Sequence, residues 1–211
     1  MRHSVSQRLA VLGATGATGR LVVSAALDAG HETVALVRRA GSLPARPGLR
    51  EVVWSDLADQ DTLAAALSGV EVVISALGGS QKGRTTVCTD AIRATIPAMH
   101  AAGVPRLIAV SAYGVLETHE RSLYARAVWS AVGEKMKDKE TMERLIVASS
   151  LDWTIVRPPA LKDVPATGTY GVGDHLPIRL WHSVGRADLA DFLVREAERP
   201  MFSRRHPRIH R

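Results

Sequence analysis

Aromatic residues are scarce in this chain of 211 residues, where Phe, Trp and Tyr together make up 4%. So few rings argue against the stacking platforms with which proteins hold single-stranded nucleic acid. The one cysteine, Cys88, excludes an intrachain disulfide and is typical of an intracellular protein. No run approaches the roughly 18 consecutive apolar residues of a membrane-spanning helix, and no apolar core before Gly13 indicates a signal peptide. We expect a cytoplasmic protein without membrane or nucleic-acid partners.

The formal net charge is +6, and it is concentrated near the C-terminus. Four arginines and no acidic residue fall in residues 201–211, which leaves the remaining chain at +2. A basic terminus can contact phosphates, but a solvated terminus is the simpler interpretation. Of the eight histidines only His206 and His210 have a helical ligand spacing, and no acid or cysteine supports them there, so we expect no metal site.

Short apolar runs alternate with segments of helical period along most of the chain. The runs assigned to strands are residues 9–12, 33–37, 51–54, 70–76, 107–110 and 153–156. The segments assigned to helices are residues 18–29, 59–67, 85–102, 123–149 with a break near Gly133, and 186–199. Strands without polar alternation, separated by helices, indicate a parallel sheet covered on both faces. This predicts one α/β domain, a Rossmann-like doubly wound parallel sheet with helices on both faces, and loops from residues 158–184 over its carboxyl edge.

A glycine-rich turn follows the first predicted strand and opens the first helix, with the sequence Gly-Ala-Thr-Gly-Ala-Thr-Gly at residues 13–19. Glycines three apart allow a tight turn and a close approach of the backbone to a diphosphate, which the N–H groups of the helix attract. The strand–turn–helix context is the one that this motif requires, so we predict a dinucleotide site, with a purely structural turn as the alternative. The contacts are expected from Gly13, Thr15, Gly16, Ala17, Thr18 and Gly19. We assign residues 1–200 to an NAD(P)-binding domain and 201–211 to a basic tail.

The residues after the second strand indicate which dinucleotide binds. A site for NAD(H) needs an acid near the end of this strand for the ribose 2′-hydroxyl. Here Arg38 and Arg39 follow the strand, and no acid occurs before Glu51. Two guanidinium groups suit a 2′-phosphate, so the sequence favours NADP(H), unless the pair is a solvated strand end.

Two further strand ends supply candidate cofactor contacts. Asp56, with Leu57 beside it, follows the third strand and would accept a hydrogen bond from the adenine amino group, although a turn or N-cap role is equally compatible. Ala76, Leu77 and Gly78 follow the fourth strand, where small residues let a cofactor lie against the backbone. A simple turn is the alternative there.

Together these motifs resemble the atypical short-chain dehydrogenase/reductase superfamily, in its NAD(P)H-binding, NmrA-like and biliverdin-IXβ/flavin-reductase branch. The resemblance extends from Arg8 to about Ala197 and includes residues 110–112, 151–158 and 184–190. It implies that Ser111 lies beside the nicotinamide and that Pro158 shapes the nicotinamide pocket. It also implies that Lys139 points toward the nicotinamide, with Tyr113 as an alternative hydroxyl. The alternatives are a strand-ending serine and a solvated lysine.

One departure from this superfamily concerns its proton donor. Standard members have a Tyr followed four residues later by a Lys, and none of the three tyrosines, Tyr113, Tyr124 and Tyr170, has that partner. Hydride transfer to a conjugated ring needs no such pair, because solvent can supply the proton. We therefore predict an NADPH-dependent oxidoreductase acting on a small-molecule acceptor (a flavin, a quinone or a similar ring), with a metal-free site and an oligomeric state left open. A non-catalytic NADP(H)-sensing NmrA-like protein and an epimerase or isomerase are the alternatives.

The acceptor is expected to meet apolar side chains of the loops over the carboxyl edge. The candidates are Leu161, Val164, Tyr170, Leu176 and Trp181. A core position for the same residues is the alternative.

Overall fold

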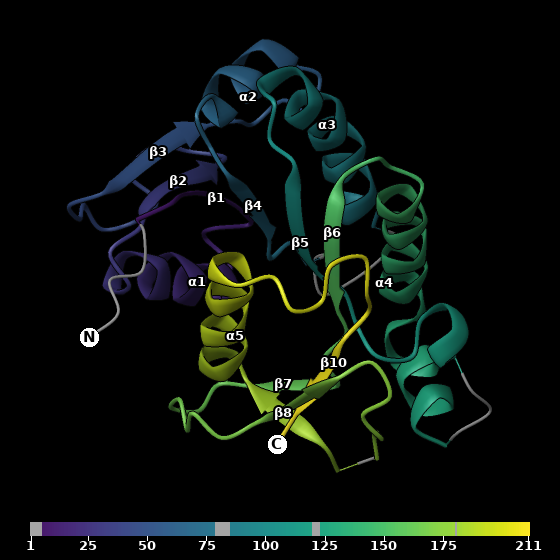
Figure 1. Ribbon diagram of the computed structural model, residues 1–211. Helices are drawn as coiled ribbons and strands as arrows, with labels where there is room; N and C mark the ends of the chain where they lie inside the picture. Colours follow the sequence, from purple (N-terminus) through teal and green to yellow (C-terminus); the bar gives the residue numbers. More distant parts are fainter. Residues whose placement is uncertain (1–5, 79–84, 120–122, 180) are drawn as a thin grey trace.

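The computed structural model describes residues 6–78, 85–119, 123–179 and 181–211 (Figure 1). Its centre is a six-stranded parallel sheet of order β3-β2-β1-β4-β5-β6. The strands are β1 (Arg8–Leu12), β2 (Glu32–Val37), β3 (Leu49–Val53), β4 (Val72–Ser75), β5 (Arg106–Val110) and β6 (Asp152–Val156). The order reverses between β1 and β4, which is the switch point of a doubly wound sheet. The predicted Rossmann-like α/β fold is confirmed.

Helices cover both faces of the sheet (Figure 1). One layer contains α1 (Ala17–Asp28) and α5 (Arg186–Glu198), which pack against each other. The other layer contains α2 (Gln60–Leu67), α3 (Val87–Ala102) and α4 (Leu123–Val147). A short 3₁₀ helix at Leu116–Thr118 lies between β5 and α4 in the sequence. Non-helical backbone at Val132 interrupts α4, next to the break predicted near Gly133. None of the helices in the described part of the chain is long and apolar enough to cross a bilayer.

Burial of both faces explains the apolar runs in the sequence. In β1, Leu9 and Val11 pack in the core beneath α1 and α5, whereas Ala10 and Leu12 pack in the core beneath α2, α3 and α4. All four side chains are at most 1% exposed. Because successive residues point to opposite faces, a strand covered on both sides favours apolar side chains at every position.

Two small sheets lie beyond the carboxyl ends of the main strands, at the bottom of Figure 1. In one, β7 (Ala160–Lys162) pairs in parallel with β9 (Ser183–Gly185), and in the other, β8 (Gly171–Gly173) pairs antiparallel with β10 (Arg208–His210). The loops predicted over this edge are thus present, but they contain short strands that the sequence pattern did not indicate.

The last eleven residues, called here the C-terminal segment, are not the solvated terminus that we expected. The segment runs along the outer edge of β6, where the N–H of Ile155 donates to the carbonyl of Arg205 (3.1 Å) and that of Arg157 to the carbonyl of Pro207 (2.8 Å). Ile209 is fully buried. The expectation was wrong because β6 is an edge strand, and its unpaired backbone groups bind a neighbouring segment whatever the charge of that segment.

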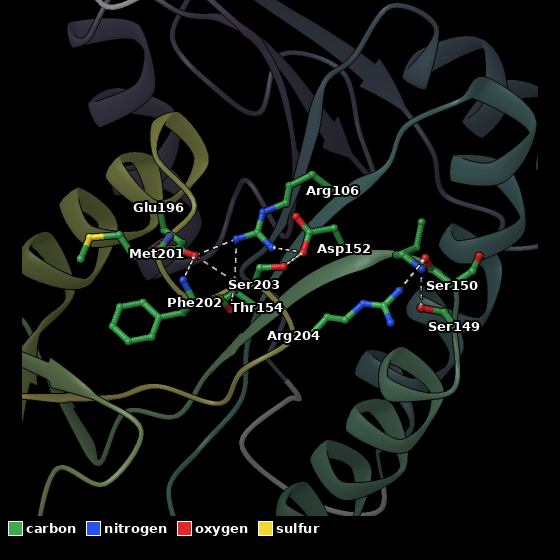
Figure 2. Close-up of polar contacts among 11 residues, drawn as sticks. Arg106, Ser149, Ser150, Asp152, Thr154, Glu196, Met201, Phe202, Ser203 and Arg204 are labelled. Atoms are coloured by element: carbon green, nitrogen blue, oxygen red, sulfur yellow. Dashed lines mark hydrogen bonds and ion pairs between the residues drawn. The ribbon is translucent and has the colours of Figure 1, made fainter.

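A polar network holds the start of the C-terminal segment (Figure 2). The carboxylate of Glu196, which is 1% exposed, accepts hydrogen bonds from the backbone N–H groups of Met201 and Phe202, both at 3.0 Å. It also accepts bonds from Arg106 (2.7 Å) and from the hydroxyl of Thr154 (3.0 Å). One side chain of α5 therefore fixes the turn from which the segment reaches β6.

Candidate functional site

A cavity of about 500 Å³ opens at the carboxyl ends of β1, β2, β3 and β4. Eight of the predicted cofactor-binding residues line it, namely Gly13, Thr15, Gly16, Arg38, Leu57, Ala76, Leu77 and Gly78. They come from four strand ends that are far apart in the sequence. Parallel strands bring such ends to one edge at the switch point, which is where open α/β sheets bind ligands.

The glycine-rich turn depends on two close backbone approaches. Gly13 has a φ of +73°, and a Cβ atom there would lie 3.0 Å from the carbonyl carbon of Ala76. A Cβ atom on Gly19 would lie only 2.0 Å from the carbonyl oxygen of Gly13. A side chain at either position would therefore separate β1 from its neighbours and displace the turn.

The N-terminus of α1 is arranged to receive an anion. Its N-cap residue, Gly16, makes no side-chain cap, and the first turn holds no acidic residue. The N–H groups of Ala17, Thr18 and Gly19 lie in this first turn, where intrahelical acceptors are lacking. Such an end carries a partial positive charge and suits a diphosphate. The loop thus fits the phosphate part of a dinucleotide.

The side of the cavity next to β2 is basic. Arg38 lines it and is exposed. Arg39 is also exposed, but it is not among the described residues that line the cavity. The carboxylate of Glu51 accepts hydrogen bonds from the N–H groups of Gly41 and Leu43, both at 2.7 Å. Glu51 therefore fixes the loop after β2 and does not turn toward a ribose.

Asp56 has a local backbone partner, because its carboxylate accepts a hydrogen bond from the N–H of Ala58 (2.9 Å). This geometry is the Asx-type turn considered as the alternative. The adenine contact of Asp56 stays a prediction.

Sequence reasoning missed Trp54, which follows β3 and lines the cavity. Its side chain is 7% exposed, and its indole Nε1 has no hydrogen-bond partner in the described part of the chain. A buried N–H donor at the wall of a cavity suits a ligand acceptor atom. The place of Trp54 at the end of a predicted strand was the available indication. Four residues at the start of α3 were also missed, Thr86, Val87, Asp90 and Ala91.

At the carboxyl end of β5, the structure brings Ser111 and Lys139 to the same edge. Ser111 is 5% exposed; its N–H donates to the carbonyl of Val156 (2.8 Å), and its hydroxyl has no hydrogen-bond partner among the described residues. The ammonium of Lys139 reaches across from α4 and donates to the carbonyls of Leu77 (2.8 Å) and Val110 (2.5 Å). Lys139 is therefore a half-buried bridge between the ends of β4 and β5, unlike the solvated lysine of the alternative interpretation.

Asp138, the residue before Lys139, holds the start of α3, which forms another wall of the cavity. The buried carboxylate of Asp138 accepts hydrogen bonds from the N–H groups of Cys88 (3.0 Å) and Thr89 (2.9 Å) at the start of α3. Burial raises the pKa of the Cys88 thiol, which disfavours the reactive thiolate form. Asp138 and Lys139 thus brace the cavity from two sides.

Tyr113 is 4% exposed, and the guanidinium carbon of Arg208 lies 5.2 Å from the centre of its ring. Its N–H donates to the carbonyl of Pro158 (2.8 Å), so this carbonyl already has a partner inside the protein. The roles assigned to Tyr113 and Pro158 stay predictions.

Two of the predicted acceptor-site side chains, Tyr170 and Trp181, have different surroundings. The hydroxyl of Tyr170 donates to Asp191 (2.7 Å), and its ring meets Phe192 of α5 edge-on. Burial and the bond to Asp191 raise the pKa of Tyr170 above its ordinary value. Trp181, in contrast, is 71% exposed. Tyr170 is therefore a partly buried side chain that packs against the core beneath α1 and α5, in the direction of the alternative interpretation.

A doubly wound parallel sheet with an uncapped, glycine-rich helix start at its switch-point cavity defines a dinucleotide-binding protein of the Rossmann class. Residues 13–200 match the family model described as NAD(P)H-binding, and the chain belongs to this family. The cofactor class predicted from the glycine-rich turn is thus confirmed.

Named relatives agree with this assignment. The chain is 31% identical to the uncharacterized sugar epimerase YhfK of Bacillus subtilis over 174 residues, which are 79% of this chain and 78% of YhfK. It is 39% identical to the isoflavone reductase homolog IRL of Zea mays over 99 residues, which are 43% of this chain and 32% of IRL. This chain thus spans about a third of the length of IRL.

A solved structure extends the likeness to the whole fold. ChuY of Escherichia coli O157:H7, described as an anaerobillin reductase, superposes with a TM-score of 0.81 at 26% identity, covering 96% of each chain. The predicted resemblance to the atypical short-chain dehydrogenase/reductase superfamily is confirmed by these matches.

Proposed function

We propose that this protein is an NADPH-dependent reductase that transfers a hydride to a conjugated small-molecule acceptor, such as a flavin or a quinone. The observation that carries the proposal is the set of side chains beside Ser111 at the carboxyl end of β5. Lys139 already donates to two backbone carbonyls there, and Tyr113 is buried beneath Arg208. A reaction that draws a proton from solvent suits this edge better than one that needs a phenol as acid or base.

The preference for NADPH rests on charge. Arg38 lines the cavity as a guanidinium, and the carboxylate of Glu51 is bound to backbone N–H groups. A 2′-phosphate would gain charge-assisted hydrogen bonds from Arg38, with Arg39 next to it, whereas a ribose 2′-hydroxyl would find no acceptor in Glu51.

Different residues of the chain would bind the cofactor, orient the reactants and position the strand ends in the proposed reaction. The turn of residues 13–19 would bind the diphosphate, and the backbone of Ala76 to Gly78 would support the adjoining ribose. Ser111 would orient the nicotinamide and the acceptor, and Lys139 would keep the ends of β4 and β5 at the spacing this requires. When bound, NADPH supplies a hydride, and a solvent proton then completes the reduction of the acceptor.

The test is the oxidation of NADPH by the purified protein with flavin mononucleotide (FMN) and with a panel of quinones, followed by loss of NADPH absorbance. We expect turnover with at least one of these acceptors and faster turnover with NADPH than with NADH. Tight binding of NADPH without turnover on any acceptor would overturn the proposal. It would favour the non-catalytic NADP(H)-sensing alternative instead.

A further inference from the structure

The C-terminal segment brings one arginine close to the proposed reaction edge. Arg208 forms a parallel bridge with Arg157, the residue after β6, and its guanidinium covers the ring of Tyr113. Tyr113 follows Ser111 by two residues. A side chain from the far end of the sequence is therefore a neighbour of the groups at the end of β5.

Two arginines near Arg208 have carboxylate partners. Arg157 is paired with the buried carboxylate of Glu143 (2.6 Å), and Arg205 with Asp174 (3.2 Å). For Arg208, no carboxylate lies within ion-pair distance in the part of the chain that the structure describes. Of these three arginines, Arg208 is thus the one that lacks a carboxylate partner among the described residues.

The guanidinium of Arg208 still has hydrogen-bonding capacity. One nitrogen donates to the carbonyl of Leu176 (3.1 Å) in a partly buried setting, and a guanidinium offers five N–H donors in all. Two residues before Tyr113, the hydroxyl of Ser111 is buried and has no partner among the described residues. A partly desolvated cation and an unpaired buried hydroxyl are both groups that a polar ligand can satisfy.

We infer that Arg208 binds an anionic substituent, a phosphate or a carboxylate, carried by the acceptor. The planar fork of a guanidinium matches both groups with two parallel hydrogen bonds. This inference rests on the proposed function, and it deepens that proposal by giving the acceptor a negative charge and a residue that recognises it.

The 2′-phosphate of the cofactor is not the anion in question. Arg38 follows β2, whereas Arg208 lies outside β6, and four strand spacings separate these two strands. At the spacing of a sheet this is about 19 Å. The two arginines therefore serve different anions, one on each partner of the reaction.

FMN and riboflavin test the inference because they share one ring system and differ by a phosphate. Binding of each to the protein loaded with NADP⁺ is measured from flavin fluorescence, and kcat/KM from NADPH oxidation. We expect the wild type to prefer FMN by about tenfold or more in both measurements. In Arg208→Ala the preference falls to nearly one through loss of FMN binding, while riboflavin and NADPH bind as in the wild type. Arg208→Lys restores part of the preference.

Arg205→Ala is the matched control, because it removes one positive charge from the same segment at a residue paired with Asp174. We expect it to keep the preference for FMN. Equal binding of FMN and riboflavin by the wild type, or an unchanged preference in Arg208→Ala, would overturn the inference even if both flavins are reduced. Absence of all turnover with a preserved, Arg208-dependent binding of FMN would overturn the proposed function alone.

Discussion

The guanidinium of Arg106 and the carboxylate of Glu196 form a buried ion pair, 2.7 Å long, with side chains 5% and 1% exposed. Arg106 begins β5 and Glu196 lies near the end of α5, so the pair joins the sheet to its covering helix (Figure 2). Because Glu196 also receives the N–H groups of the turn at Met201 and Phe202, this pair decides where the C-terminal segment starts. This contact lies at the amino ends of the strands, whereas Arg208 lies at the carboxyl end of β6. The path of the C-terminal segment toward Arg208 thus starts from a contact at the other end of the strands.

We expect Glu196→Ala to destabilise the protein strongly and to release the C-terminal segment. Removing one partner of a buried ion pair costs about 3–5 kcal/mol, and here it also takes the acceptor from the N–H groups of Met201 and Phe202. Urea unfolding measures the loss, and limited proteolysis followed by mass spectrometry locates cleavage after residue 200. Asp152→Ala is the control, since Asp152 binds the same arginine at 3.1 Å with a side chain that is 39% exposed, and it should cost about 1 kcal/mol or less. Equal effects of the two substitutions would contradict this assignment.

The sequence predicted the central sheet well because its determinants are local. A strand such as β1 is a short apolar run ended by glycine, and the helices have their own period and end signals. The C-terminal segment was misread because its sequence is basic and polar. What holds it is the backbone edge of β6, more than 40 residues earlier in the chain, together with the carboxylate of Glu196. No local pattern reports such a partner.

The double substitution Arg38→Ala with Arg39→Ala tests the choice of cofactor. If these guanidinium groups bind the 2′-phosphate, the Kd for NADPH should rise by about 10- to 100-fold, because hydrogen bonds to a charged group are lost. The Kd for NADH should stay within about twofold. Calorimetric titration with both nucleotides provides the measurement. The same loss of affinity for both would contradict the 2′-phosphate assignment.

Gly19→Ala tests the close approach that shapes the phosphate loop. Its Cβ atom would lie 2.0 Å from the carbonyl oxygen of Gly13, a backbone atom that a rotamer change cannot move away. We expect a loss of stability of about 1–3 kcal/mol and a fall in NADPH affinity of about tenfold or more as the loop shifts. Gly173→Ala, whose Cβ would meet nothing within 4 Å, should leave NADPH affinity unchanged. Normal NADPH binding by Gly19→Ala would show that the turn tolerates displacement.

The candidate site was predictable where its residues share one strand end and less so where distant elements meet. The turn of residues 13–19 and Arg38 were identified from their place after a strand. The bridge made by Lys139 was not, because it joins α4 to two backbone carbonyls. The role of Glu51 was likewise open in the sequence, since a carboxylate near β2 serves a ribose or a loop depending on where it turns.

Lys139→Met should impair turnover more than cofactor binding. The carbonyls of Leu77 and Val110 would lose their donor, and with it the bridge between the ends of β4 and β5 at the proposed nicotinamide end. We expect kcat to fall by about 10- to 100-fold while the KM for NADPH changes by less than about threefold. Lys137→Met is the control, because Lys137 is exposed and bonded to Glu134 three residues away. A change confined to KM would contradict a positioning role.

Asp188 gives a prediction about pH. Its buried carboxylate accepts hydrogen bonds from the N–H groups of Gly168 (2.9 Å) and Thr167 (2.8 Å) and from the Thr167 hydroxyl (3.0 Å). Burial alone would raise the pKa of Asp188, but these hydrogen bonds outweigh it and hold the pKa below the ordinary value of 3.8. A lowered pKa means that Asp188 stabilises the fold fully above pH 3.8 and loses this contribution as the pH falls through its folded pKa.

The substitution Asp188→Asn should therefore reduce stability by about 1–3 kcal/mol near neutral pH, because an amide accepts fewer hydrogen bonds than a carboxylate. Thermal unfolding of both proteins from pH 7 downward should show a constant difference in Tm that narrows below pH 3.8. Asp163→Asn, at an exposed carboxylate paired with Arg186, is the control and should show little difference at any pH. A difference for Asp188→Asn that persisted unchanged into the acid range would mean that the carboxylate is not ionised in the folded protein.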